Sequence, residues 1–165
     1  MAPVCPSPLR SAPRTRCRGH RGRDPGRGVV TESTHRIAVV AAVVRRGMRY
    51  LVCRRPMRKR HGGLWEFPGG KVMEGETRLA AVRRELDEEL GIETTGIGHL
   101  LYSAADAGSP FLIEFVEAFA TGDPVLHEHT ELGWFAAAEL LELSLAPADA
   151  RFAEMLASGT ITVRD

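Results

Sequence analysis

Apolar residues recur along this chain with the periods of strands and helices. A continuous apolar run extends from Ile37 to Val44, and a second, mostly apolar run, from Tyr50 to Arg54, follows a turn that contains Gly47. Short apolar runs separated by turn residues are typical of buried strands, so these two predict a β-hairpin. Further strands are predicted at residues 98–103, 111–120, 133–135 and 160–163.

The segment from Thr77 to Leu90 has the pattern of an amphipathic helix. It contains no Pro or Gly, and Gly91 stands where the helix is expected to end. With successive residues turned by about 100°, four apolar side chains share one stripe: Leu79, Val82, Leu86 and Leu90. Shorter helices are predicted at residues 137–142 and 148–156. Strands interleaved with helices predict an α/β sandwich around a mixed sheet.

Three carboxylates lie in an arc beside the apolar stripe: Glu85, Glu88 and Glu89. Like charges three and four residues apart destabilise a helix by about 0.2–0.5 kcal/mol per pair, and many such arcs are only solvated acidic faces. Here Gly69 and Gly70 precede the helix by a short loop, so backbone groups can approach a ligand closely. The combination favours a site for a hard divalent cation such as Mg2+, which binds oxygen ligands jointly with phosphates.

A longer motif surrounds these carboxylates. The segment fits the pattern G-x5-E-x7-R-E-U-x-E-E-x-G-U, in which U is aliphatic, at every fixed position: Gly70, Glu76, Arg84, Glu85, Leu86, Glu88, Glu89, Gly91 and Ile92. On this match the chain resembles the Nudix hydrolases of the MutT-like group, over about residues 36 to 157. The resemblance implies an α/β/α sandwich with a mixed β-sheet. It also implies hydrolysis of nucleoside triphosphates to the monophosphate and pyrophosphate, with Mg2+ as cofactor and Mn2+ as a substitute.

The resemblance assigns roles to individual residues. It implies metal ligation by five residues, through a backbone carbonyl in the first: Gly69, Glu85, Glu88, Glu89 and Glu128. Glu85 is also a candidate for orienting or deprotonating the attacking water. Glu76 is expected to pair with Arg84 and hold the loop on the helix. The two histidines that flank Glu128 are too few for a zinc site.

Other positions match the substrate cleft of MutT-like proteins. Arg55 and Arg60 stand where those proteins contact substrate, and the planar guanidinium suits phosphate oxygens. Taken singly, each arginine is equally well interpreted as a surface charge. Glu66 and Phe67 line the same cleft in the family. Arg54, Arg58 and Lys59 add positive charge nearby.

The segment Leu145 to Asp149 resembles the part of the family that recognises the base. MutT has Asn at the position of Asp149, whereas CTP and modified-pyrimidine pyrophosphohydrolases have a similar Leu-Ala-Pro-Ala-Asp. An ionised Asp only accepts hydrogen bonds, which suits the amine of cytosine and also the N1–H and amine of a guanine-type edge. The leading hypothesis is an 8-oxo-dGTP diphosphatase that cleans the nucleotide pool and prevents DNA mutation; the alternative is a CTP or modified-dCTP pyrophosphohydrolase.

An alternative hypothesis from a different functional class is that the chain is a non-catalytic, nucleotide-sensing Nudix domain. Such versions usually lose glutamates of the motif, and this chain keeps all of them. A third hypothesis is that an Arg-rich N-terminal segment recruits RNA. We expect neither stable nucleic-acid binding nor an organelle signal, because the segment has no amphipathic or apolar stretch.

Composition separates the chain into two parts. Residues 1–34 hold seven basic and two acidic residues and five of the ten prolines, so this extension is predicted to be disordered. Residues 35–165 are predicted to form one Nudix domain. The apolar run from Ile37 to Val44 has eight residues, short of the ~20 that cross a membrane. Three scattered cysteines indicate no disulfide framework, so we expect a cytoplasmic protein. The resemblance implies a small-molecule substrate, a nucleoside triphosphate, and we expect a monomer.

Overall fold

The computed structural model describes residues 36–105 and 109–163. The chain divides into two units, Met1–Ser33 and Thr34–Asp165, and every described residue belongs to the second. The expected disorder of residues 1–34 therefore falls outside the described residues. None of the described helices is both long and apolar enough to cross a membrane.

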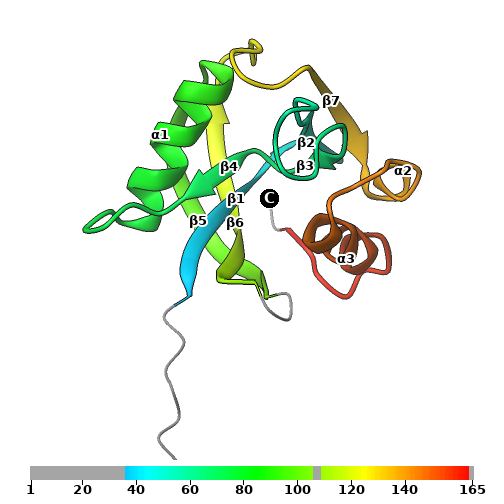
Figure 1. Cartoon of the computed structure of the whole chain (residues 1–165). Helices are drawn as coiled ribbons and strands as arrows, with labels where there is room; N and C mark the ends of the chain where they lie inside the picture. The colour runs from blue at the N-terminus through cyan, green and yellow to red at the C-terminus, as the bar shows by residue number, and fades with distance from the viewer. Residues whose placement is uncertain (1–35, 106–108, 164–165) are drawn as a thin grey trace, which may run out of the picture. The chain divides into compact units, whose positions relative to one another are not determined.

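Seven strands form one sheet in the order β3-β2-β1-β6-β5, with β4 paired to β1 and β7 paired to β2 (Figure 1). Their bounds are β1 Ile37–Arg46, β2 Arg49–Arg54, β3 Trp65–Glu66, β4 Gly69–Lys71, β5 Glu93–Ala104, β6 Phe111–Thr121 and β7 Glu131–Ala136. Strands β1 and β6 run parallel, and the other pairs are antiparallel. The sheet is therefore mixed, as the sequence predicts.

Strand β1 is buried on both faces, which explains its unbroken apolar sequence. Val40, Ala42 and Val44 belong to the core beneath α1, whereas Ala41 and Val43 belong to the core beneath α3. The helices are α1 Arg78–Leu90, α2 Ala137–Leu140 and α3 Pro147–Ala157. Figure 1 shows α1 and α3 on opposite sides of the sheet. The fold is thus the predicted α/β/α sandwich.

Local signals fix both ends of α1. The hydroxyl of Thr77 caps the first turn by accepting a hydrogen bond from the amide of Ala80 at 3.2 Å. At the other end Gly91 adopts φ 61°, a left-handed conformation that glycine tolerates best. Its N–H bonds the carbonyl of Asp87 at 2.9 Å. The helix predicted from Thr77 to Leu90 is confirmed, with Thr77 as its cap.

Two strand predictions differ from the structure. Strand β5 begins at Glu93 rather than at Gly98, and its pairing with β6 contains register shifts that interrupt a simple period. Residues 160–163 form no strand, so that prediction was wrong. Their apolar side chains, Ile161 and Val163, pack against the core beside α3 without a strand partner. Burial without pairing produced the strand-like pattern.

The pairing of β1 creates room for a site. Its first half pairs with β4, from Val39↔Lys71 to Ala41↔Gly69, while its end pairs with β2 at Arg45 and Arg46. The chain between β2 and β4, residues 55–68, therefore leaves this edge of β1 and returns to it. We call this segment the excursion. Strand β3, within that excursion, pairs with β2 and bridges to Leu145, which brings the start of α3 to the same place.

Candidate active site

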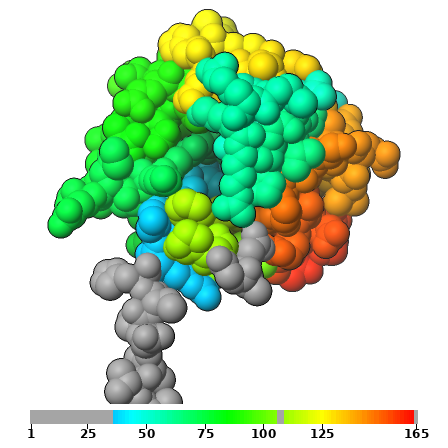
Figure 2. Space-filling model, in the orientation of Figure 1, coloured from blue at the N-terminus to red at the C-terminus, as the bar shows by residue number. Residues whose placement is uncertain are grey.

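A cavity of about 450 Å³ opens between α1 and the excursion that connects β2 to β4. Figure 2 shows this hollow beside the cyan surface of the excursion. Its lining includes residues from distant parts of the sequence: Arg55, Lys59, Arg60, Glu66, Phe67, Gly69, Gly70, Glu85, Glu89, Glu128 and Asp149. Most of the predicted site residues therefore share one cavity. Three predicted residues are not in its lining: Glu76, Arg84 and Glu88.

Glu89 is the most buried carboxylate of α1 that faces the cavity. Its Oε2 accepts a hydrogen bond from the amide of Gly69 at 3.0 Å. Burial raises the pKa of Glu89 to about 7. Gly69 has φ 148°, and a Cβ there would overlap the carbonyl oxygen of Val40. A glycine is required at this position, because only then can β4 bring its amide to Glu89.

Arg84 organises the carboxylates behind the cavity wall. Its Nε and Nη2 bind the two oxygens of Glu76, each at 3.0 Å, so the predicted ion pair is present. These hydrogen bonds lower the pKa of Glu76. Nη2 also donates to the carbonyl of Lys71 at 3.0 Å, which ties β4 to the helix. Nη1 contacts Glu85 at 2.7 Å and Glu88 at 3.3 Å.

Glu85 lies against β4. A Cβ at Gly70 would overlap the Glu85 carboxylate, so the absence of a side chain at Gly70 provides the space that this carboxylate occupies. Glu88, by contrast, is not part of the cavity lining, and its side chain is 59% exposed. On the facing segment, Glu128 forms an ion pair with the Lys59 ammonium. The described residues contain no group of three or more His, Cys, Asp or Glu side chains arranged to hold a metal ion.

The predicted ligands nonetheless fit a hard divalent cation. Their donors are oxygens, from four carboxylates and the backbone carbonyl of Gly69, and Mg2+ and Mn2+ prefer oxygen ligands. Glu85 and Glu89 line the cavity. The carboxylate of Glu88 forms a partly exposed ion pair with Arg84, and that of Glu128 forms one with Lys59. A divalent cation, if bound here, would supply the positive charge that Arg84 and Lys59 supply in this structure.

The opposite end of the cavity is basic. The guanidinium of Arg55 pairs with the Glu66 carboxylate, and its Nε donates to the carbonyl of Arg60 at 2.7 Å. Arg60 and Lys59 line the same cavity. The two arginines predicted to bind substrate, Arg55 and Arg60, therefore line the same cavity. Lys59, which the sequence analysis named only as nearby positive charge, lines it too.

Two hydrogen bonds connect the start of α3, which carries Asp149, to residues 65–67. The Trp65 carbonyl accepts a hydrogen bond from the amide of Ala146 at 2.8 Å, and the Phe67 amide donates to Oδ1 of Asp149 at 2.9 Å. Burial raises the pKa of Asp149 to about 7. A neutral carboxyl group both donates and accepts hydrogen bonds, so Asp149 can pair with more than one kind of base edge.

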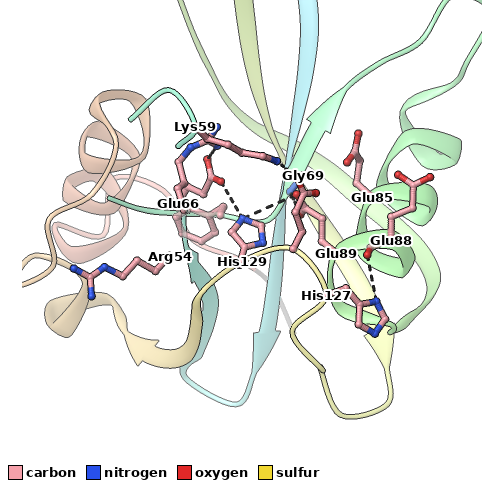
Figure 3. Close-up of polar contacts among 12 residues, drawn as sticks. Arg54, Lys59, Glu66, Gly69, Glu85, Glu88, Glu89, His127 and His129 are labelled. Atoms are coloured by element: carbon pink, nitrogen blue, oxygen red, sulfur yellow. Dashed lines mark hydrogen bonds and ion pairs between the residues drawn. The ribbon is translucent and has the colours of Figure 1, made fainter. Parts of the chain in front are cut away.

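His129 is the residue of this region that sequence reasoning missed. It is buried, and its Nε2 lies 3.0 Å from Oε1 of Glu66 (Figure 3). The sequence shows two histidines around Glu128 but carries no signal for which of them points inward. Only the path of the loop places His129 inside and leaves the His127 ring outside, with Nδ1 3.2 Å from the carbonyl of Glu88.

The sequence profile of the NUDIX domain matches residues 34–156. The chain belongs to the Nudix family. Two relatives are similar to this chain in sequence. One is the CTP pyrophosphohydrolase of Escherichia coli K12, 42% identical over 68% of this chain and 85% of that protein. The other is a Mycobacterium tuberculosis protein, provisionally named 8-oxo-dGTP diphosphatase 2, 39% identical over 67% of this chain and 81% of that protein.

Solved structures of Nudix proteins agree with this assignment. The solution structure of the Escherichia coli ORF135 protein has a TM-score of 0.62 at 40% identity, covering 72% of this chain and 86% of that one. The crystal structure of a MutT Nudix hydrolase from Burkholderia pseudomallei has a TM-score of 0.63 at 32% identity, covering 73% and 96%. The family, the MutT-like group and the hydrolase class predicted from the sequence are confirmed.

Proposed function

We propose that this Nudix hydrolase cleaves nucleoside triphosphates to the monophosphate and pyrophosphate. The observation that carries the proposal is the single cavity in which Glu85 and Glu89 face the basic side chains of Arg55, Lys59 and Arg60. Carboxylates suit a divalent cation and arginines suit phosphate oxygens, so the two ends match the two partners of a metal–triphosphate complex.

The residues divide the chemistry between them. When bound, Mg2+ neutralises phosphate oxygens and lowers the pKa of a water molecule. Glu85 orients or deprotonates the attacking water, and Arg84 fixes Glu85 from behind the cavity wall through its 2.7 Å contact. Arg55 and Arg60 bind the phosphates and stabilise the charge that develops on the leaving pyrophosphate.

The proposed substrate is an oxidised purine triphosphate, 8-oxo-dGTP, which gives the enzyme a role in cleaning the nucleotide pool and avoiding DNA mutation. A second candidate is CTP or a modified dCTP. Two observations favour it: the Leu-Ala-Pro-Ala-Asp sequence that ends at Asp149, and the 42% identity to a protein named CTP pyrophosphohydrolase. We place the enzyme in the cytoplasm as a monomer that binds no nucleic acid.

Pyrophosphate release with Mg2+ from 8-oxo-dGTP, dGTP, CTP, dCTP and 5-methyl-dCTP tests the proposal. A preference for 8-oxo-dGTP supports the pool-cleaning role, and a preference for the cytosine nucleotides makes Asp149 a cytosine-recognising residue. If no triphosphate is hydrolysed, the proposed function fails. Nucleotide binding without turnover would then identify a sensor domain.

The same assay checks the metal assignment through Glu89. The substitution Glu89→Gln keeps the size of the side chain but removes the charge, and we expect turnover to fall by about 100-fold or more. Asp87→Asn is the matched control, because Asp87 is exposed on the same helix and lies outside the cavity lining. Equal turnover of the two variants would refute the role of Glu89.

A further inference from the structure

His129 lies between two carboxylates of the cavity lining, Glu66 and Glu89. Its Nε2 is 3.0 Å from Oε1 of Glu66, at the end that holds Arg55, and 4.0 Å from Oε1 of Glu89, at the carboxylate end (Figure 3). The side chain is buried. A single ring nitrogen therefore faces both carboxylates, one on β3 and one on α1.

The backbone around His129 is fastened to two different elements. The amide of His127 donates to the carbonyl of Glu89 at 3.0 Å, and the amide of Thr130 donates to the carbonyl of Arg54 at 3.0 Å. These bonds attach the segment to the last turn of α1 and to the end of β2. The imidazole is thus held in place from both sides.

The two ring nitrogens of His129 have different surroundings. Nε2 lies within hydrogen-bond distance of Oε1 of Glu66. The other oxygen of Glu66 pairs with Arg55. Nδ1 of His129 is buried and has no hydrogen-bond partner within residues 36–105 and 109–163. An unpaired buried polar atom costs about 1–3 kcal/mol, so stability alone does not explain a histidine here.

We propose that His129 is a positioning residue of this active site. Its Nε2–H holds the Glu66 carboxylate against Arg55, and its ring keeps Glu89 beside Gly69, so the substrate end and the metal end keep a fixed separation. The inference rests on the proposed function, because that function gives Glu66 and Glu89 their roles. It assigns His129 no contact with substrate and no proton transfer.

Two polar variants test the proposal. In His129→Gln an amide N–H can reach about as far as Nε2, whereas in His129→Asn the amide ends near the position of Nδ1 and cannot reach Glu66. We would measure the Mn2+ dissociation constant without nucleotide, by electron paramagnetic resonance, together with kcat and KM. Since residues behind metal ligands typically contribute 10- to 100-fold, we expect His129→Asn to lose about tenfold or more in kcat/KM and in Mn2+ affinity. His129→Gln should recover most of both.

The outcomes separate the two proposals. Wild-type values for His129→Asn, or equal losses in the Asn and Gln variants, would overturn the positioning role. If the wild-type protein hydrolyses no triphosphate, the proposed function fails, while the Mn2+ affinities still decide whether His129 positions Glu89. His99→Gln is the control, because His99 is exposed on β5, whereas His129 is buried beside Glu66.

A measurement on the unmodified protein avoids any effect of substitution on folding. Ring nitrogen resonances of histidines can be followed by NMR during a Mg2+ titration. If His129 contacts the carboxylate end, its Nε2 resonance shifts on Mg2+ addition and that of His99 does not. An unmoved His129 resonance in a protein that binds Mg2+ would contradict the proposal.

Discussion

At the residue scale, burial gives identical side chains different chemistry. Glu88 and Glu89 are neighbours in sequence, yet Glu88 is exposed and paired with Arg84, while burial raises the pKa of Glu89 to about 7. Asp149 is buried in the same way and accepts a hydrogen bond from the Phe67 amide. The difference arises from the depth of each carboxylate and from the dipoles that face it.

The Asp149 carboxyl should make folding stability depend on pH. Its folded pKa of about 7 lies above the ordinary aspartate pKa of 3.8, so the folded state keeps a proton that the unfolded state releases between those values. The wild type should therefore lose stability relative to Asp149→Asn as pH rises from 4 to 7, by about 1 kcal/mol per pH unit, and the difference should level off above pH 7. Urea unfolding of both proteins at several pH values measures this.

The Asn variant keeps an oxygen that can accept from the Phe67 amide, so the comparison isolates the charge. Asp123→Asn, an exposed position paired with Arg46, should give a stability curve parallel to the wild type. A stability difference between wild type and Asp149→Asn that stays constant from pH 4 to pH 8 would show that burial does not perturb this carboxyl.

At the element scale, α1 and β4 form one unit. The cap at Thr77 and the glycine at Gly91 set the helix ends, and both are readable in the sequence because they act through neighbouring residues. The contact between Gly70 and Glu85 is different. It depends on where β4 crosses α1, so the spacing of the motif does not by itself predict the contact between Gly70 and Glu85.

The substitution Gly70→Ala should lower turnover while it changes the free energy of unfolding far less. Its Cβ would overlap the carboxylate of Glu85, which is the end of a flexible side chain and can move. Displacing a catalytic group by about 1 Å is expected to lower turnover on the order of 10- to 100-fold. We expect stability to change far less, as measured by urea unfolding.

The matched control is Gly96→Ala on β5, where a Cβ would meet only the ring of Phe119 at an ordinary 3.7 Å. Full activity in Gly70→Ala would mean that the position of Glu85 does not limit turnover. Equal losses of activity in both variants would point to a general effect of alanine in the sheet.

At the scale of the whole molecule, charge is distributed unevenly along the chain. Residues 1–34 carry a net charge of +5, from seven basic and two acidic residues, and residues 35–165 carry −4, from 15 basic and 19 acidic residues. The cavity and both cores belong to the second part. This arrangement favours a catalytic domain that does not need the N-terminal segment.

Deletion of residues 1–33 should leave kcat/KM and Tm close to the values of the full chain. The reason is that every residue assigned to the site lies between Arg55 and Asp149, within the unit Thr34–Asp165. RNA affinity, measured by fluorescence anisotropy on both forms, should be equally weak. RNA binding that the deletion abolishes would instead support recruitment of RNA by the Arg-rich segment.

The family, the helix with its C-terminal glycine and the continuous burial of β1 could all be predicted from residue order. These features rest on local spacing: a helix period, a glycine at the helix end and a motif within 23 residues, from Gly70 to Ile92. The short strands β3 and β4 were not predictable, because two or three residues show no period. Their partners lie far away in sequence.

Tertiary structure alone decided which charged groups meet. The Arg55–Glu66 and Lys59–Glu128 pairs, the burial of Asp149 and the inward position of His129 each join segments that the sequence separates. Electrostatic environment depends on depth and on neighbours in space, and neither can be read from residue order. Sequence spacing therefore identifies the chemistry of this protein, while the crossing of its strands and loops sets the protonation, pairing and position of the groups that perform it.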